Sequence, residues 1–348
     1  MKNKFKTPDF VRKRGIVLSP EMMPYESALT FNAGITRWQG RYVMLFRNDY
    51  GFCSKDFDDF YAGISDNTTP STNIGAAFSD DGVNWEIMPE PVFSLQGNGI
   101  SRVYDPRITI LDESAIVCFA VQGYGTRGGV AVTKDFKNFE VKSISLPENR
   151  NMVIFPEKIN GEYCRLERPF LTGKGAHPIW LSRSRDLEYW GKSELVLSVR
   201  DLPYANLKIG PGAPPVKTPY GWLTLIHGVA TMEKSFSAWE RNWNRCYYAG
   251  VMLLDLENPA KVLAVADRPL LVPEEDYELT GFRGGVIFPG GAVPEADGTL
   301  KIYYGAADTV ECLAEAKIED LIDFCCTNNV LRGNFKTPQN CQSALASI

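Results

Sequence analysis

The stretch GAAFSDDGVNWE (Gly75–Glu86) recurs twice further along the chain, and this repeat is the strongest indication of the fold. The two echoes are GVAVTKDFKNFE (Gly129–Glu140) and IWLSRSRDLEYWG (Ile179–Gly191). Each copy has the pattern of a strand, followed by a Ser/Thr-x-Asp triplet and by an aromatic residue four positions past the Asp. We expect the Asp carboxylate to accept hydrogen bonds from backbone N–H groups in a turn, and the aromatic ring to pack back onto the sheet.

The period of this repeat indicates a β-propeller. The repeated residues Asp81, Asp135 and Asp186 are 54 and 51 residues apart, and looser echoes end at Asp255 and Asp308. Five units over 348 residues leave about 70 residues for each unit, which suits a blade of four short strands with functional loops. The sequence therefore predicts an all-β, five-bladed propeller whose ligand site lies where the innermost strands converge.

The local composition agrees with this architecture. Thirty Gly and 22 Pro supply turns between runs of β-branched and aromatic residues. The predicted strands include Arg41–Arg47, Ile108–Leu111, Ala115–Val121, Gly221–Ile226 and Leu300–Tyr304. Helical periodicity is expected only in a short C-terminal segment, Glu311–Phe324. Lys208–Pro215 is too rich in Gly and Pro for a regular strand, and we expect Glu148–Arg168 and Trp239–Trp243 to be insertions that shape the site.

The chain is predicted to form one catalytic domain, residues 1–330, followed by a polar tail, residues 331–348. No run of about 18 apolar residues is present, and no signal-peptide pattern follows the basic N-terminus. The eight Cys lack metal spacing, which favours reduced cysteines in a cytoplasmic protein. The net charge of −5 argues against nucleic acid or an anionic membrane as partner, whereas self-association is compatible with the sequence.

Short polar motifs stand in or beside the predicted strands. They are Tyr104-Asp105-Pro106-Arg107, Asn149-Arg150-Asn151, Arg165-Leu166-Glu167-Arg168, Lys208-Ile209-Gly210, His227-Gly228 and Asp308. Guanidinium groups match phosphate oxygens bidentately. A carboxylate that can donate a proton, accompanied by several cations, is therefore suited to breaking a sugar bond with inorganic phosphate, which requires neither a metal nor a bound cofactor.

Taken singly, each motif is also compatible with a structural role. Asp105-Pro106 matches a common turn directly before a strand, and Arg107 would share a face with Asp105 in extended structure. His227 closes an apolar strand, which suits either a binding site or a buried structural histidine, whereas His177 has the character of a loop residue. Two His and no Cys cluster make a transition-metal site a poor fit. Nucleotide P-loop, serine-nucleophile and dinucleotide motifs are absent from the sequence.

Taken together, the motifs resemble family 130 of the glycoside hydrolases, which contains inverting β-mannoside phosphorylases and mannosidases. The similarity runs from Phe31 to about Thr309. Beyond the polar motifs it includes Phe155–Lys158, Gly221–Leu223, Gly250–Asp255, Tyr277-Glu278, Phe288-Pro289 and Tyr303–Asp308. The resemblance implies a five-bladed propeller, in agreement with the repeat.

The resemblance also implies the reaction and the site. Asp105 would be the sole catalytic carboxylate and act as general acid. The implied phosphate-binding residues are Arg150, Asn151, Arg168, His227 and Tyr247, and the implied sugar-binding residues are Asn32, Arg47, Tyr104, Lys208 and Asp308. The enzyme would be a phosphorylase of the hexosyltransferase type. A mannose-containing oligosaccharide and inorganic phosphate would give α-mannose 1-phosphate with inversion, and phosphate, already anionic, needs no base.

Two other functions stay open. A hydrolytic β-mannosidase would lack one of Arg150, Arg168 or His227, or would add a carboxylate base, for which Glu278 is the candidate. A glycan-binding propeller without activity would be expected to lack Asp105 or the phosphate cations. The linkage, β-1,4 or β-1,2, stays open as well, and the Trp-rich insert Ala230–Arg245 leaves the acceptor sugar open.

Overall fold

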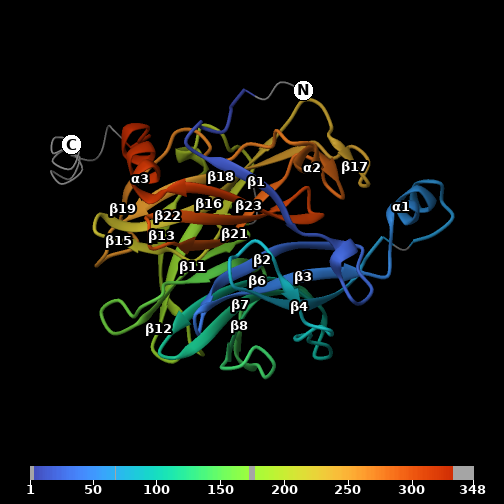
Figure 1. Cartoon of the computed structure of the whole chain (residues 1–348), viewed down its shortest axis with the longest axis horizontal. Helices are drawn as coiled ribbons and strands as arrows, with labels where there is room; N and C mark the ends of the chain where they lie inside the picture. Colours follow the sequence, from blue (N-terminus) through green and yellow to red (C-terminus); the bar gives the residue numbers. More distant parts are fainter. Residues whose placement is uncertain (1–3, 67, 172–176, 332–348) are drawn as a thin grey trace.

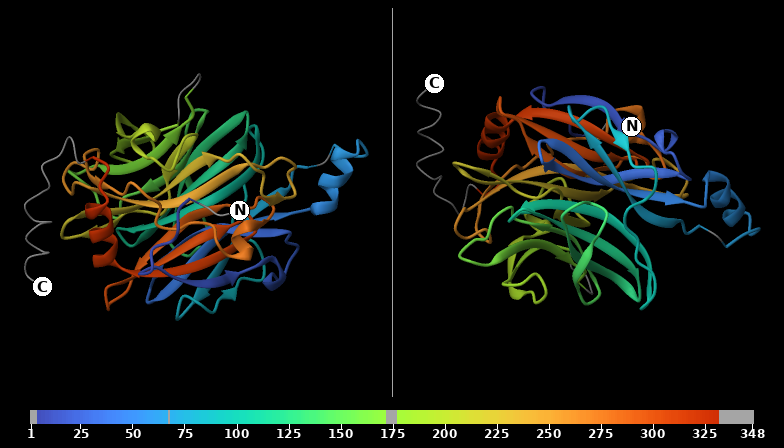
Figure 2. Two further views of the ribbon diagram at one scale, coloured as in Figure 1. Left: turned by 90° about the horizontal axis from the view of Figure 1, so that it is seen from above. Right: turned by 60° about the horizontal axis from the view of Figure 1, so that its bottom comes forward.

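The computed structural model describes residues 4–66, 68–171 and 177–331, and its main strands form five antiparallel sheets (Figures 1 and 2). Blade 1 contains β2 (Leu29–Trp38), β3 (Arg41–Tyr50), β4 (Ser71–Ser79) and β5 (Glu86–Ile87). Blade 2 contains β6 (Ile100–Leu111), β7 (Ser114–Gly123), β8 (Gly125–Thr133) and β9 (Glu140–Ile144). Blade 3 contains β10 (Asn149–Ile154), β11 (Tyr163–Pro169), β12 (Ile179–Ser184) and β13 (Gly191–Leu197).

The last two blades are less regular. Blade 4 contains β14 (Lys208–Pro211), β16 (Gly221–Thr231), β18 (Arg245–Leu254) and β19 (Val262–Val265), with β15 (Val216–Thr218) beside β16. Blade 5 contains β21 (Ile287–Pro294), β22 (Thr299–Ala306), β23 (Val310–Lys317) and β1 (Arg12–Leu18). These five sheets confirm the predicted all-β, five-bladed propeller, and each of the five predicted strands lies within an observed one.

The first strand of the chain closes the propeller. β1 pairs antiparallel with β23, so the N-terminal strand completes the blade that the C-terminal strands begin. Figure 1 shows the blue β1 beside the red β23. Because the two ends of the chain share one sheet, separating them would break a complete β-ladder.

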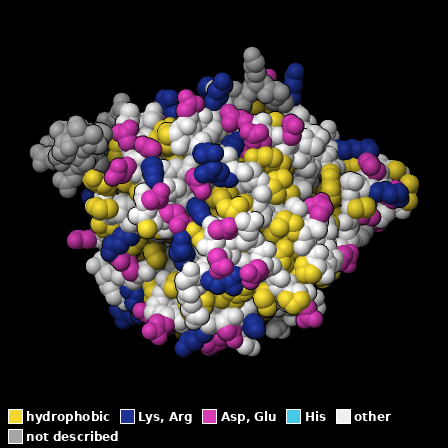
Figure 3. Space-filling view, viewed as in Figure 1, with side chains coloured by type: hydrophobic (Ala, Val, Ile, Leu, Met, Phe, Trp, Pro, Cys, Tyr) yellow, Lys and Arg dark blue, Asp and Glu magenta, His cyan; other side chains and the backbone are white. Residues whose placement is uncertain are grey.

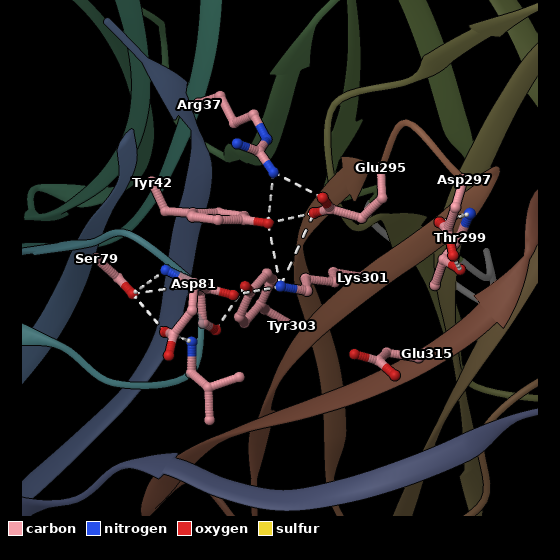
Figure 4. Close-up of polar contacts among 12 residues, drawn as sticks. Arg37, Tyr42, Ser79, Asp81, Glu295, Asp297, Thr299, Lys301, Tyr303 and Glu315 are labelled. Atoms are coloured by element: carbon pink, nitrogen blue, oxygen red, sulfur yellow. Dashed lines mark hydrogen bonds and ion pairs between the residues drawn. The ribbon is translucent and has the colours of Figure 1, made fainter. Parts of the chain in front are cut away.

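Hydrogen bonds connect blade 5 to blade 1 (Figure 4). The Tyr42 hydroxyl donates to Glu295 and accepts from Lys301 Nζ at 3.0 Å. Tyr303 donates its hydroxyl to the carbonyl oxygen of Gly82 at 2.7 Å. Tyr42 and Tyr303 are almost fully buried, so these bonds form away from solvent, where an unmet hydroxyl is costly.

The turns predicted from the repeat are present. Asp81 Oδ1 accepts from the backbone N–H groups of Val83 at 2.7 Å and Asn84 at 2.8 Å, and these bonds hold the pKa of Asp81 well below its usual range. Asp135, Asp186 and Asp255 accept two backbone N–H groups in the same way. Each of these turns joins the third and fourth strands of a blade.

The prediction that Asp308 ends a fifth copy of the repeat was wrong. Asp308 lies between β22 and β23, the second and third strands of blade 5. That blade takes its fourth strand, β1, from the other end of the chain, so it has no turn of the repeated kind. The spacing to Asp308 therefore does not report a repeat of the turn.

The predicted C-terminal helix was only half right. Glu311–Lys317 belong to β23, and the helix α3 spans Ile318–Thr327. Leu, Ala, Glu and Lys favour a helix, but pairing with β22 on one side and β1 on the other overrides that local preference. Residues 332–348, nearly all of the predicted tail, lie outside the described residues, and the domain boundary stays a prediction.

Three further expectations need correction. Lys208–Pro211 forms the innermost strand of blade 4, because it pairs with β16 despite its Gly and Pro. Glu148–Arg168 is no insertion: β10 and most of β11, two strands of blade 3, fall within it. Helices occur outside the C-terminal segment, namely α1 (Ser54–Tyr61), α2 (Asp276–Leu279), and the 3-10 turns Pro20–Met22 and Val199–Asp201. A short parallel pair, β17 (Ser237–Ala238) and β20 (Thr280–Gly281), lies beside blade 4.

Candidate active site

The innermost strands of blades 1, 2 and 3 each carry a β-bulge at the same place. The register shifts between Phe31 and Gly34, between Tyr104 and Arg107, and between Arg150 and Val153. The residues at the bulges are Asn32, Asp105 and Asn151, with φ of 54°, 53° and 56°. Asn and Asp tolerate this left-handed conformation better than other residues with a side chain, and a bulge re-aims the side chain it carries.

The position of Asp105 in the fold differs from the prediction. Asp105 lies within β6 rather than directly before a strand. Because the bulge interrupts the alternation of side chains, Arg107 does not follow Asp105 along a regular strand face. The Arg107 guanidinium binds backbone carbonyls and forms no ion pair with Asp105.

Asp105 is held by two donors from blade 1. Its Oδ1 accepts from Asn32 Nδ2 at 3.0 Å and lies 3.5 Å from Arg47 Nη1. Arg47 is itself fixed by a forked pair with Asp49, at 2.9 Å and 2.5 Å, and its guanidinium lies 5.1 Å from the centre of the Tyr104 ring. Burial lowers the pKa of Arg47, but Asp49 and Asp105 outweigh it and raise the pKa above its ordinary value.

Asp308 joins this group from blade 5. Its Oδ2 lies 3.4 Å from Arg283 Nη1, and Arg283 Nε donates to Glu240 at 2.9 Å. Burial raises the pKa of Asp308, while the charges of Arg283 and Arg47 oppose the rise. We call Asn32, Arg47, Asp105 and Asp308 the acid side of the site.

The cation side of the site consists of Arg150 on β10, Arg168 on β11, Lys208 on β14 and His227 on β16. Arg168 Nη1 lies 3.1 Å from His227 Nε2. Burial and the charge of Arg150 lower the pKa of Arg168 to about 9, and burial with Arg168 lowers the pKa of Lys208 well below its usual range. The pKa of His227 falls well below its usual range for the same two reasons.

The cation side lacks a carboxylate to balance it. Among residues 4–66, 68–171 and 177–331, no ion pair joins a carboxylate to Arg150, Arg168 or Lys208. The Nε atoms of Arg150 and Arg168 and the Nδ1 atom of His227 are buried without a protein hydrogen-bond partner. Buried donors that neighbouring side chains leave unmet are suited to an anion.

Tyr247 on β18 forms a wall of this side. Its ring is stacked 6.3 Å from that of His227, and Lys208 Nζ lies 5.2 Å from its centre. Gly210 faces His227 across the β14–β16 ladder. A Cβ at Gly210 would stand 2.4 Å from His227 Cε1, so glycine leaves the space that the imidazole occupies.

Arg150 links the two sides. Burial lowers its pKa, but Tyr104, Asp105 and Tyr247 raise the pKa above its ordinary value. The acid and the cations therefore lie within electrostatic reach of one another. The structure thus brings the predicted site residues other than Asn151 together, with Lys208 among the cations, whereas Asn151 is placed only by its bulge next to Arg150 on β10.

Sequence reasoning missed other residues of the site. Arg283, which no motif marked, contacts Asp308 and also Glu240. Glu240 lies in Trp239–Trp243, the segment expected to shape the site, but no role was predicted for it. His177, regarded as a loop residue, has its pKa lowered by burial and by Arg168 and Lys208. The backbone carbonyl of His177 accepts a hydrogen bond from Ile209 N, next to Lys208, at 3.1 Å. The sequence marked His177 only as one of two His in the chain.

Glu278 is not a base facing the site. It is fully buried, and Oε2 pairs with Lys13 Nζ at 2.7 Å while Oε1 accepts from Tyr304 at 2.9 Å. Its backbone donors come from Glu274 and Glu275 at the start of α2. The carboxylate named for a hydrolytic mechanism is therefore occupied by structural contacts.

The described residues contain neither a membrane-spanning helix nor a metal-binding cluster. No helix in that part of the chain is long and apolar enough to cross a membrane. The same residues contain no group of three or more His, Cys, Asp or Glu side chains placed to hold a metal ion. On the face shown in Figure 3, acidic and basic side chains are interspersed.

A five-bladed propeller that gathers a carboxylic acid and several cations on the first and second strands of its blades has the fold and the charged groups of an enzyme that cleaves glycosides. The chain is a member of glycoside hydrolase family 130, whose model, described as beta-1,4-mannooligosaccharide phosphorylase, matches residues 3–327. The resemblance drawn from the motifs is thereby confirmed, as is the class of enzyme, a glycosyltransferase-type phosphorylase.

Individual relatives agree. A beta-1,2-mannobiose phosphorylase of Listeria innocua is 38% identical over 257 residues, which cover 73% of this chain and 69% of the relative. A beta-1,4-mannooligosaccharide phosphorylase of Ruminococcus albus is 33% identical over 277 residues, covering 76% and 80%. The solved complex of the Listeria innocua beta-1,2-mannobiose phosphorylase with beta-1,2-mannobiose superposes with a TM-score of 0.78 at 28% identity, covering 90% of this chain and 99% of that one.

Proposed function

We propose that the protein cleaves a β-mannoside with inorganic phosphate and releases α-mannose 1-phosphate and a shortened sugar. Its family contains β-mannoside phosphorylases, and relatives named for β-1,2-mannobiose and β-1,4-mannooligosaccharides support this substrate class. Mannose-containing oligosaccharides and phosphate are the partners that this reaction requires. No metal or further cofactor takes part, so dialysis against a chelator should leave the rate unchanged.

In the proposed reaction a phosphate oxygen attacks the anomeric carbon from the face opposite the leaving sugar. The bond to the glycosidic oxygen breaks, and that oxygen receives the proton of Asp105. The electron pair of the broken bond stays on the glycosidic oxygen, and the configuration at the anomeric carbon inverts. Phosphate supplies its own negative charge, so the second carboxylate of an inverting hydrolase is not needed.

The two sides of the site divide this work. Asn32, Arg47, Tyr104 and Asp308 bind the mannose next to Asp105. Arg150, Asn151, Arg168 and His227 bind the phosphate, with Tyr247 as a wall. Lys208 lies among the cations, from where its ammonium serves either the phosphate or the mannose hydroxyls, and both uses agree with its burial.

One observation carries the proposal: in the described part of the chain the half-buried Arg150 and the buried Arg168 and Lys208 have no carboxylate partner. An unpaired charge inside a protein is destabilising, so such a group is maintained where a ligand neutralises it. A hydrolase that activates water would need a base here rather than three cations, and Glu278 is engaged elsewhere.

The experiment is to incubate the purified protein with β-1,2-mannobiose, β-1,4-mannobiose and mannosyl-glucose, each with and without phosphate. We expect mannose 1-phosphate, detected by phosphorus NMR, to appear only with phosphate, and its α signal to establish inversion. Equal release of free mannose under both conditions would establish a hydrolase instead. The panel also identifies the linkage and the acceptor sugar.

A further inference from the structure

The centre of the propeller is occupied by a side chain to which no role has been assigned. Arg107 is 4% exposed and donates to four backbone carbonyls. Nε binds Gly212 O at 2.8 Å, Nη1 binds Asn32 O at 2.9 Å and Pro106 O at 2.6 Å, and Nη2 binds Pro289 O at 3.4 Å. These carbonyls come from the innermost segments of four different blades.

The surrounding backbone is built closely around this guanidinium. A Cβ at Gly34 would stand 2.7 Å from Arg107 Cα. A Cβ at Gly290 would stand 2.0 Å from Ala33 O and 3.2 Å from Arg107 Cζ. Neither glycine has a positive φ, so what glycine supplies at both positions is room for the neighbouring strands.

Two of the bound carbonyls belong to the bulges of the acid side. Asn32 O is the carbonyl of the residue whose side chain donates to Asp105, and Pro106 O follows Asp105 by one residue. On the far side of the first bulge, the buried Glu311 accepts from Ala33 N at 3.0 Å. The bulge between Asn32 and Ala33 is thus held from both of its faces.

Arg107 is engaged by protein alone. In the described part of the chain no carboxylate forms an ion pair with it, and three of its nitrogens are already bonded to carbonyls. A planar guanidinium fork fixes several acceptors at once with little loss of freedom, whereas a lysine ammonium is a single point. Its effect on the reaction must therefore pass through the backbone that it holds.

We infer that Arg107 is a positioning residue for the general acid: it fixes the two bulges from which Asn32 and Asp105 meet. This inference rests on the proposed function. A proton can be transferred only within a short, directed contact, and a displacement of about 1 Å can cost about 10²-fold in rate. Loss of the hydrogen bonds from Arg107 to these carbonyls should therefore impair the proton transfer more than any other part of the reaction.

The test uses Arg107→Lys, which keeps the charge and removes the fork, with two β-mannosides of different leaving group. Cleavage of mannobiose needs the proton, whereas cleavage of 2,4-dinitrophenyl β-mannoside hardly needs it. We expect kcat for mannobiose to fall about 10²-fold, with less than about a fivefold loss on the dinitrophenyl substrate. The KM for phosphate should stay unchanged.

A matched control is Arg165→Lys. Arg165 is equally buried, at 4% exposed, but it lies on β11 and pairs with Glu167 at 2.6 Å. Arg165→Lys should lower the melting temperature, and any change in rate should be the same for both leaving groups. Equal losses on both substrates for Arg107→Lys would assign Arg107 to the fold alone, and an unchanged kcat on both would remove it from the mechanism; either result overturns the inference.

A second variant keeps the inference testable if Arg107→Lys does not fold. Glu311→Gln weakens the other support of the same bulge, because a neutral amide replaces the carboxyl that binds Ala33 N. It should show the same preference for the dinitrophenyl substrate, to a smaller degree, and an equal loss on both substrates would contradict the inference. If the wild-type enzyme makes no mannose 1-phosphate, the proposed function fails, whatever the variants show.

Discussion

The acid side of the site comes from blades 1, 2 and 5 and the cation side from blades 3 and 4, and the charges of the two sides are balanced differently. On the acid side each charge has a protein partner: Arg47 pairs with Asp49 and contacts Asp105, and Asp308 contacts Arg283. On the cation side no carboxylate in the described part of the chain pairs with Arg168 or Lys208, and burial together with neighbouring positive charges lowers the pKa of both groups.

The difference indicates when each side is complete. The acid side is held in position by protein contacts before any ligand binds, as a group that transfers a proton requires. The cation side is complete only with an anion between its donors, since buried charges without a partner are destabilising. Substitutions should therefore separate the two sides by the ligand that each one affects.

The largest effect is expected from Asp105→Asn. The amide retains the shape of the carboxyl group and can still contact Asn32 and Arg47, but it cannot donate a proton to the leaving oxygen. The rate on mannobiose should fall by about 10² to 10⁴. Calorimetric affinity for the mannoside should change little. An Asp105→Asn enzyme that kept most of its activity on mannobiose would show that another group is the acid.

The next largest effect should divide the two sides. Replacing Arg168 by Ala removes charge-assisted hydrogen bonds worth about 1.5–3 kcal/mol, which corresponds to a loss of roughly tenfold to a hundredfold in kcat/KM for phosphate. Affinity for a mannoside measured without phosphate should be unchanged. Arg150→Ala should behave alike, and Asp308→Asn should show the opposite pattern.

The exposed Arg185 provides a control for this comparison. Its side chain is 83% exposed on the same blade, so Arg185→Ala should change neither ligand. If Arg168→Ala and Asp308→Asn weakened both ligands equally, the division into two sides would be wrong, provided that their melting temperatures stayed close to that of the wild type. A clear fall in melting temperature would instead show a loosened fold.

A smaller effect is expected from crowding the cation side. A methyl group at Gly210 would stand 2.4 Å from His227 Cε1 and 2.7 Å from Nε2, so the imidazole must shift. Overpacking costs about 1–3 kcal/mol, and we expect the low end because a ring can move. Gly210→Ala should raise the KM for phosphate about fivefold. Gly191→Ala, where a Cβ meets nothing within 4 Å, should leave it unchanged.

Features of the fold that depend on local sequence could be predicted, whereas those that depend on pairing between distant strands could not. The blade count came from Asp81, Asp135 and Asp186 together with the looser echoes at Asp255 and Asp308. The turns at the first four of these Asp residues are local and recur in blades 1 to 4, whereas blade 5 has no such turn. The strand Val310–Lys317 was missed because pairing with distant strands, rather than local preference, determines it. The N-terminal β1 was missed as the closing strand for the same reason.

The site divides in the same way. Residues in motifs, such as Asp105 and Arg168, were found because the resemblance covers them. Arg283 was missed because its role depends on contacts with Asp308 and Glu240 that are formed only in the fold. The shared bulge at Asn32, Asp105 and Asn151 was also invisible, since a left-handed residue in a strand leaves little trace in the sequence.

The smallest effect concerns protons. Burial and neighbouring cations lower the pKa of Lys208 and of His227, which favours the neutral form of each group before an anion binds. A bound dianion reverses the repulsion and raises both pKa values. Anion binding should therefore take up protons, and affinity should fall as the pH rises. An uptake of half a proton would change affinity about threefold for each pH unit.

Sulfate is the probe for this prediction, because it does not titrate near neutral pH, and any proton taken up must come to the protein. Calorimetry at pH 8 in two buffers of different ionisation enthalpy measures the uptake. We expect the apparent binding enthalpy to differ between the buffers for the wild type, and the difference to shrink in Lys208→Met and in His227→Gln. Identical binding enthalpies in the two buffers would mean that neither Lys208 nor His227 changes its protonation when the anion binds. The cation side would then differ from the acid side only in its lack of carboxylates, and not in its response to an anion.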